Sequence, residues 1–438
     1  MPNIVARSQL SAGRGHALSV TAQQIVVAVT VGLFILSAGV NAFRKDITQG
    51  FDEVAQTSYV AQLQSTGEIW PRLETLKLLD PASLRFTDSA NYLNHPPLYY
   101  ALLAQLGPRL EGHAQAVVID RLLNVVLATL GLAALLAIGL LARLPLLTLY
   151  AYCVPLACVP VLAPLAGSIQ NDNATFAAGA VATLAVWQLA ATGRRAWLLA
   201  ALAAVVVTAW AKLTGLLLVG GMVGGVLAWM MLRRQLPLAW VMPIAVALLL
   251  AAAPYLIFIA QYGSPTPNTP AQAALLETGA QATGWQQAAR MSFPAYVLYF
   301  MTNFIADWMP ALAPRNAFQY AMLVLPVGAA LCAIGGIALS AARLWRRQDD
   351  PIDAVIVAGA LAFAATLAVH VVYSYGRHVS TGWMLDAYPR YYLPLVAIVP
   401  LAGLSLLAAT NGPRRRAALT AFLIAGPILF RLLGTPLG

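Results

Sequence analysis

The chain has 438 residues, of which 60% are hydrophobic and only 10% are charged. Soluble domains carry near 25% charged residues, so this composition excludes a soluble protein and indicates a membrane protein throughout. The net charge of +10 does not indicate nucleic-acid binding, because the arginines stand in short clusters between apolar runs, as they do on the cytoplasmic side of membrane helices.

The first long apolar run covers residues 20–42 and follows Arg7 and Arg14. A secretory signal peptide would have a shorter apolar run and a small-residue cleavage site, and neither is evident here. We therefore predict a retained signal anchor whose N-terminus lies in the cytoplasm.

Ten further apolar runs approach the ~20-residue length with which a helix crosses a bilayer. Their ranges are 118–142, 145–167, 174–192, 196–211, 214–232, 237–260, 319–342, 353–374, 391–411 and 417–433. They predict one all-α polytopic membrane domain over 1–438, with about 11 (11–13) transmembrane helices. The piece 97–107 is too short to span and is predicted as a juxtamembrane or re-entrant helix; a crossing there would invert the topology downstream.

The arginine clusters fix which loops share a side. They are Arg143, Arg194–Arg195, Arg233–Arg234, Arg343 with Arg346–Arg347, and Arg414–Arg416. Alternation of 11 spans places all of them inside, with the N-terminus. The loops that it places outside are 43–117, 168–173, 261–318 and 375–390. Most of the 16 acidic residues fall in these outer loops, so any chemistry is expected there.

The first outer loop, 43–117, opens with FDEVAQTSYVAQL at 51–63. This stretch is predicted as a juxtamembrane amphipathic helix on the membrane surface, and IWPRLETLKLLDP at 69–81 as a second one. Asp52 and Glu53 begin the first helix, where a carboxylate can act as general base on a hydroxyl. The ordinary alternative is a solvated pair of loop charges.

Other outer segments also carry polar side chains. His95 and Tyr99 lie in NHPPLYY at 94–100, and Asp172 in GSIQNDNATF at 167–176 is either a site residue or the cap of the following helix. Lys212 marks a tight turn between two runs. The segment 375–395 holds Arg377, His378, Arg390 and Tyr391. An arginine fork matches phosphate oxygens, whereas the tyrosines also suit a membrane-interface anchor.

In their order along the chain and in their location on the predicted outer side, the motifs resemble those of the GT-C superfamily of membrane glycosyltransferases. The likeness is to protein O-mannosyltransferases, lipid A aminoarabinose transferases and related bacterial families. The stretches that carry it are DE at 52–53, HPPL at 95–98, RLLN at 121–124, NDN at 171–173 and PRYYLP at 389–394. They cover roughly the first 200 residues and the last 60. The second half of the loop 261–318 matches no motif of the group, so the acceptor stays open.

The resemblance implies a GT-C-like bundle and an inverting transfer of one sugar from a polyprenyl-phosphate donor. The acceptor would be a glycan, a lipid or a protein at the outer, periplasmic face of the bacterial inner membrane. Asp52 would be the base for the acceptor hydroxyl, and Glu53 would help position a substrate. The leaving lipid phosphate needs positive charge and hydrogen-bond donors rather than a strong acid.

The candidate donor-phosphate and substrate-binding residues are His95, Tyr99, Arg121, Asp172, Lys212, Arg377, His378, Arg390 and Tyr391. Metal dependence stays open, because the group contains members with and without a divalent metal. The alternative function is a transporter or flippase of lipid-linked saccharides. Such a protein needs polar residues or broken helices at the membrane midplane, whereas these runs are apolar at their centres.

Overall fold

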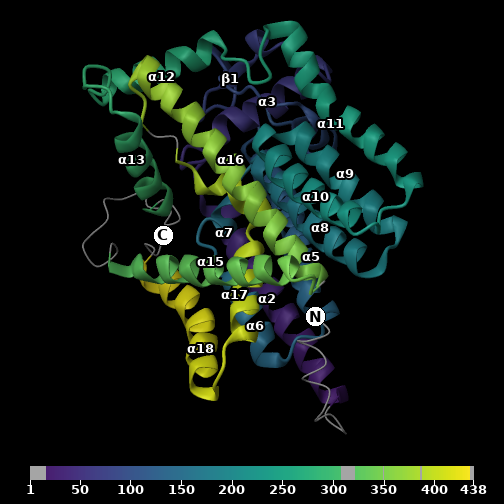
Figure 1. Ribbon diagram of the computed structural model, residues 1–438. Helices are drawn as coiled ribbons and strands as arrows, with labels where there is room; N and C mark the ends of the chain where they lie inside the picture. The colour runs from purple at the N-terminus through teal and green to yellow at the C-terminus, as the bar shows by residue number, and fades with distance from the viewer. Residues whose placement is uncertain (1–15, 307–320, 349, 385–386, 435–438) are drawn as a thin grey trace.

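A computed structural model describes residues 16–306, 321–348, 350–384 and 387–434 (Figure 1). The described chain is helical apart from one two-stranded antiparallel sheet. The prediction of an all-α polytopic membrane protein is therefore confirmed. Arg7 and Arg14, and residues 307–318 of the predicted outer loop 261–318, lie outside the described residues.

Eight helices within these residues are long and apolar enough to cross a membrane. They are α2 (His16–Arg44), α5 (Ala114–Leu141), α8 (Asn171–Thr192), α10 (Leu213–Leu232), α11 (Val241–Tyr262, preceded by η3, Leu238–Trp240), α15 (Val324–Trp345), α16 (Pro351–Thr381) and α18 (Pro413–Leu429, followed by η5, Phe430–Gly434). A bent pair, η4 (Pro389–Leu395) with α17 (Ile398–Ala409), raises the number to nine. The predicted count of 11 is not confirmed.

The difference comes from short or broken helices. The run 145–167 divides into α6 (Leu146–Ala157) and α7 (Leu162–Ala166), and Pro155, which lacks a backbone N–H, lies just before the break. The run 391–411 begins as the 3₁₀ helix η4 and turns by 58° into α17. Two more apolar helices, α9 (Arg195–Ala211) and α13 (Phe293–Ala306), are shorter than a full span.

The loop after α2 is compact. It contains α3 (Glu53–Thr66), η2 (Leu73–Thr75), β1 (Lys77–Leu79), β2 (Phe86–Ala90) and α4 (Leu98–Leu106), and α12 (Pro270–Ala282) lies in a later loop. The nine-residue α4 is the predicted short helix of 97–107.

The second predicted amphipathic helix, 69–81, is wrong, because this segment forms η2 and then pairs β1 with β2. Side chains of α3 compensate the backbone of the strand: Ser58 Oγ accepts from the Leu79 N–H at 2.8 Å, and Gln62 Oε1 accepts from the Lys77 N–H at 3.1 Å. Tertiary hydrogen bonds therefore override the helical pattern.

The helix α3 exists as predicted, but its environment differs from the prediction. Its polar residues Gln56, Thr57 and Ser58 are buried together with its apolar ones, and Gln56 accepts a 2.7 Å bond from Tyr100 of α4. A helix lying on the membrane surface would keep one polar face in water. Instead, α4 and the β1–β2 hairpin pack against α3.

The turns gather at two ends of the molecule. In Figure 1, α3, β1 and α12 lie at the upper end, and the start of α2 and the α17–α18 turn lie at the lower end. At the lower end Gln23 of α2 donates to the carbonyl of Leu144, beside Arg143, at 2.6 Å. Arg233 donates to the carbonyl of Leu344 at 3.2 Å. Segments that the arginine pattern assigned to one side are thus neighbours.

Two glycines let the segments of the upper end approach closely. A Cβ on Gly167, after α7, would lie 2.6 Å from the carbonyl oxygen of Ala38 in α2. A Cβ on Gly179 in α8 would lie 2.5 Å from the carbonyl oxygen of Pro394 in η4. These contacts bring the end of α2, the start of α8 and η4 around one point.

Candidate active site

A charged cluster occupies the meeting point of α2, α3, α5, α8, the α9–α10 turn and η4. Its members among the predicted site residues are Asp52, Glu53, Arg121, Asp172, Lys212, Arg390 and Tyr391. Five of them, Glu53, Arg121, Asp172, Lys212 and Arg390, are buried, whereas the side chain of Asp52 is 42% exposed. A substrate can therefore reach the Asp52 carboxylate.

Asp52 is the residue before α3, and its backbone is unusual. Phe51 and Asp52 both have φ of 60°, in the left-handed region. Each such non-glycine residue costs on the order of 1–3 kcal/mol, and such strain is concentrated at functional sites. The conformation presents the Asp52 carboxylate to two donors, Arg390 Nη2 at 2.8 Å and the Tyr92 hydroxyl at 3.1 Å.

The charge of Asp52 is stabilised by these partners. Burial of its surroundings opposes ionisation, but the guanidinium of Arg390 and the hydroxyl of Tyr92 outweigh it and lower the pKa of Asp52 below its usual range. Asp52 is therefore an ionised carboxylate that is open to a ligand.

Arg390 extends from η4 and is held among aromatic rings. Its guanidinium lies 5.2 Å from the ring centre of Phe51, 5.1 Å from Tyr388 and 5.4 Å from Tyr391. Its Nε is 3.6 Å from Oδ2 of Asp172, and neither atom has a hydrogen-bond partner among the described residues. The buried guanidinium thus keeps its Nε–H without a hydrogen-bond partner among the described residues, near Asp172.

Lys212 and Asp172 form the second ion pair. Lys212 Nζ donates to Asp172 Oδ1 at 2.7 Å and lies 3.6 Å from the ring centre of Tyr391. Of the two roles left open for Asp172, the helix cap is contradicted, since Gln170 occupies the cap position of α8. The residue is instead the buried partner of Lys212.

Glu53 and Arg121 form the third ion pair, and both of its side chains are buried. Two parallel bonds of 2.7 and 2.8 Å join them, and Glu53 also accepts from the Ile169 N–H at 2.8 Å. Arg121 Nη1 donates to the carbonyls of Ala42 and Lys45. This pair joins α2, α3, α5 and the turn before α8.

His95 is half-buried in the loop before α4. Burial, with the nearby charges of Lys212 and Arg390, lowers the pKa of His95 to about 3. His95 is therefore neutral at physiological pH and offers a hydrogen bond but no positive charge. Tyr99 is buried, and its hydroxyl donates to Asn124 of α5 at 2.9 Å.

Arg377 and His378 lie near the end of α16 and have other neighbours. His378 accepts from the Met291 N–H at 3.0 Å and stacks on Tyr296, with ring centres 5.1 Å apart. Arg377 donates to the Tyr373 hydroxyl at 3.1 Å. The His378 contacts reach α13 and the residue two positions before it, the Arg377 contact is made within α16, and none of these contacts involves the Asp52 cluster.

Sequence reasoning missed Lys45, Phe51, Tyr92 and Tyr388. Lys45 Nζ donates to Ser168 Oγ at 2.7 Å and lies 4.4 Å from the ring centre of Phe51. One signal was present, because a lysine directly after the first span, on the predicted outer side, runs against the positive-inside rule.

The described residues contain no group of three or more histidine, cysteine or acidic side chains that could hold a metal ion. The three carboxylates of the cluster are each bonded to an arginine or a lysine. Metal dependence therefore has no ligand set to support it in this part of the chain.

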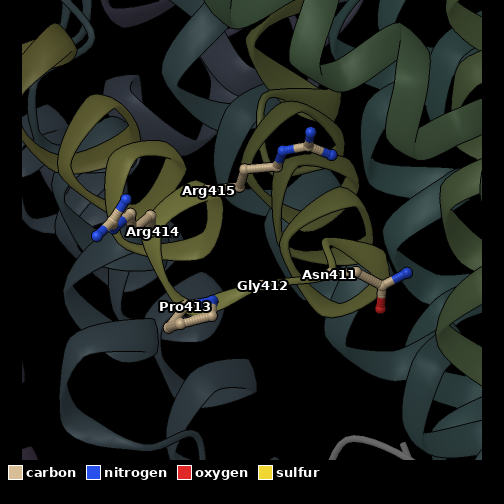
Figure 2. A pocket seen from close by; sticks show the side chains of 5 residues that line it. All are labelled: Asn411, Gly412, Pro413, Arg414 and Arg415. Atoms are coloured by element: carbon tan, nitrogen blue, oxygen red, sulfur yellow. The ribbon is translucent and has the colours of Figure 1, made fainter.

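A separate, open concavity lies at the α17–α18 turn, lined by Asn411, Gly412, Pro413, Arg414 and Arg415. Figure 2 shows the side chains of Arg414 and Arg415 extending to different sides of the turn. The lining has no carboxylate or aromatic ring. It offers neither a general base nor a platform for a sugar.

No family model and no curated protein matches the sequence. Among solved structures, ArnT from Cupriavidus metallidurans in the apo state is similar, with 15% identity and a TM-score of 0.48. The same protein bound to undecaprenyl phosphate gives 16% identity and a TM-score of 0.46. Each alignment covers 90% of this chain and 62% of the ArnT chain. The chain thus spans less than two thirds of the length of these proteins.

Proposed function

We propose that the protein is an inverting glycosyltransferase that moves a sugar from a polyprenyl-phosphate donor to an acceptor hydroxyl. The observation that carries the proposal is the contact between the exposed carboxylate of Asp52 and the buried guanidinium of Arg390. A general base and a phosphate-binding fork are thereby adjacent at one end of a membrane protein. The GT-C-like motifs of the sequence agree with this reaction.

The reaction forms one bond and breaks one. Asp52 accepts the proton of the acceptor hydroxyl as that oxygen attacks the anomeric carbon, and the bond from this carbon to the phosphate oxygen breaks. The electron pair leaves with the lipid phosphate. Arg390 and Lys212 stabilise the charge that develops on this leaving group.

The other cluster residues support this pair. Glu53 and Arg121 are positioning residues, because their mutual bonds use up the Glu53 carboxylate and hold the start of α3 in place. Tyr391 lies against both Lys212 and Arg390, and neutral His95 supplies a hydrogen bond. The proposal leaves Tyr99, Arg377 and His378 outside the phosphate site.

The active site is proposed to lie on the periplasmic side of the inner membrane, with the N-terminus in the cytoplasm. The positive-inside rule supports this, since arginine-bearing turns lie at the end opposite α3. A membrane-impermeant maleimide tests it. A cysteine placed by Asp46→Cys should react in intact cells, and one placed by Arg414→Cys should not; the opposite pattern would reverse the orientation.

A flippase of lipid-linked saccharides is the rival, because the break between η4 and α17 is a feature that transporters also show. Against a flippase, the helix break places Arg390 in contact with the Asp52 carboxylate, the proposed base.

The acceptor class, whether glycan, lipid or protein, follows from what becomes labelled in an assay. Membrane lipids are expected around the apolar helices, and the arginine clusters are interpreted as topology signals rather than as a nucleic-acid surface.

The deciding experiment gives purified protein radiolabelled polyprenyl-phosphate sugars together with a membrane extract. We expect the label to move to an acceptor while free polyprenyl phosphate appears in equal amount. The Asp52→Asn protein should give neither product. Movement of intact labelled donor across a liposome membrane, with no bond broken, would establish the flippase instead.

A further inference from the structure

The cations of the cluster outnumber its carboxylates by one. Arg121 pairs with Glu53, Lys212 with Asp172, and Arg390 with Asp52. Lys45 is the fourth cation, and no described carboxylate lies within ion-pair distance of its ammonium. Asp120, which precedes Arg121 in the chain, does not balance it, because the Asp120 carboxyl lies against Gly107.

Lys45 is held in place by its backbone and its side chain. Its carbonyl oxygen accepts a 2.7 Å bond from Arg121, and its ammonium donates to Ser168 Oγ at 2.7 Å. Ser168 in turn donates to the carbonyl of Pro164. The only described hydrogen bond of the ammonium is therefore to a neutral hydroxyl, which leaves two of its three donors for a ligand.

The position of the ammonium relates it to the reacting groups. Lys45 Nζ lies 4.4 Å from the centre of the Phe51 ring, and the guanidinium of Arg390 lies 5.2 Å from the centre of the same ring. Phe51 directly precedes Asp52. Lys45 and Arg390 therefore both lie against the Phe51 ring, and the flexible stem of a lysine allows its ammonium to turn toward an anion that Arg390 binds.

We propose that Lys45 binds the phosphate group of a polyprenyl-phosphate lipid, together with Arg390. The surplus charge of one matches the single negative charge of a phosphodiester donor. The proposal rests on the proposed function, and it adds a residue and a ligand contact to it. Burial and the positive charges of Arg121 and Arg390 outweigh the attraction of Glu53 and lower the pKa of Lys45 to about 8. A bound anion would relieve the repulsion between Lys45 and the two arginines.

Binding of undecaprenyl phosphate to purified protein, measured by microscale thermophoresis in detergent, tests the proposal without any sugar transfer. Lys45→Gln should weaken binding about tenfold or more, the loss expected for a charge-assisted hydrogen bond, and Lys45→Arg should retain most of the affinity. Arg44→Gln is the matched control, because Arg44 is an exposed cation at the adjacent position. It should bind as the wild type does.

Two further ligands identify what is recognised. Uncharged undecaprenol should bind wild type and Lys45→Gln equally, and inorganic phosphate should compete with undecaprenyl phosphate in the wild type but less in Lys45→Gln. If undecaprenol binding falls as much as lipid-phosphate binding, Lys45 acts on the shape of the site and the proposal is wrong. If phosphate fails to compete, the lipid tail and not the phosphate is recognised, and the proposal is again wrong.

The failures of the two proposals are distinguishable. A wild-type protein that does not bind undecaprenyl phosphate overturns the lipid-phosphate donor itself. A wild type that binds, beside Lys45→Gln that binds equally well, overturns only the role of Lys45.

Should Lys45→Gln not fold, the wild type alone gives an answer. Affinity for undecaprenyl phosphate should fall between pH 7 and pH 9 as Lys45 loses its proton, because binding favours the charged form. The charged groups that face Lys45 are Glu53 on α3, Arg121 on α5 and Arg390 on η4, and each is held in its own ion pair. Lys45→Arg should abolish the fall, and a wild-type affinity that is constant over this range contradicts the proposal.

Discussion

Asp52 and Arg390 are 338 positions apart in the chain, yet the carboxylate of one lies 2.8 Å from the guanidinium of the other. Asp52 comes from the first loop after α2, and Arg390 comes from the 3₁₀ turn η4 near the other end of the sequence. The proposed general base and the proposed phosphate-binding residue are therefore partners in one ion pair. Substitutions of these two residues give the sharpest tests.

Replacing Asp52 by Asn removes the base with almost no change of shape. Turnover should fall by roughly 10²-fold or more, because a general base typically contributes 10²- to 10⁴-fold. Asp46→Asn is the control, since Asp46 is an exposed acid of the same loop whose carboxylate bonds only to Thr48 among the described residues. Steady-state assays with labelled donor measure both, and equal rates for the two variants would remove Asp52 from the chemistry.

The pH dependence of turnover follows from the lowered pKa of Asp52. A base with a pKa below its usual range stays ionised as the pH falls, so turnover should not decline between pH 7 and pH 5. The neutral state of His95, whose pKa is about 3, gives no titration in this range either. Turnover that halves near pH 6 would show that a group of higher pKa acts as the base.

Replacing Arg390 by Lys keeps the charge but loses the planar fork and its contact with three rings. The ratio kcat/KM for the donor should fall about 10- to 100-fold, the loss of a charge-assisted hydrogen bond. Arg109→Lys should have no effect, because Arg109 is exposed and pairs with Glu111 at 3.4 Å on the surface. A variant Arg390→Lys with unchanged donor kinetics would make Arg390 an interface anchor.

Glu53→Gln should act on stability more than on chemistry. It leaves the guanidinium of Arg121 buried without its carboxylate, which destabilises a protein by about 3–5 kcal/mol. Glu111→Gln, which breaks an exposed pair, should change stability by no more than about 1 kcal/mol. Thermal unfolding in detergent compares the two, and equal melting temperatures would show that the Glu53–Arg121 pair is not structural.

Gly179→Ala tests the contact that holds η4 against α8. The added Cβ would lie 2.5 Å from a backbone oxygen of η4, and backbone cannot rotate away, so destabilisation of about 1–3 kcal/mol is expected. Gly224→Ala in α10 meets no atom within 4 Å and should not destabilise. Because η4 carries Arg390, donor affinity should fall with stability only in the Gly179 variant.

The helices were largely predictable, because each apolar run must satisfy its backbone internally in a membrane. The breaks were less visible, although Pro155, Pro389 and Pro394 mark them in the sequence. The β1–β2 hairpin was not predictable from periodicity. Its strand bonds to side chains of α3, and such long-range hydrogen bonds leave no local pattern.

For the site, the sequence indicated which residues gather but not how they pair. Outer location and residue type singled out Asp52, Arg121, Asp172, Lys212 and Arg390. Nothing in the sequence shows that Arg121 closes on Glu53 while Arg390 leaves Asp52 exposed. Lys45 was missed although its position after the first span runs against the positive-inside rule. Tyr92 was missed because a single tyrosine in the loop before α4 gives no motif.

The distance in sequence between Asp52 and Arg390 also sets an order for biosynthesis. Ribosomes deliver the chain to the membrane from its N-terminus, so Glu53 meets Arg121 early, Lys212 follows, and Arg390 is the last residue of the cluster's ion pairs to arrive. A nascent chain therefore holds the three carboxylates of the cluster with Lys45, Arg121 and Lys212 but without Arg390. If the proposed function is right, chains arrested before residue 390 should be inserted into the membrane yet should not bind the lipid phosphate, because they lack the η4 segment that carries Arg390.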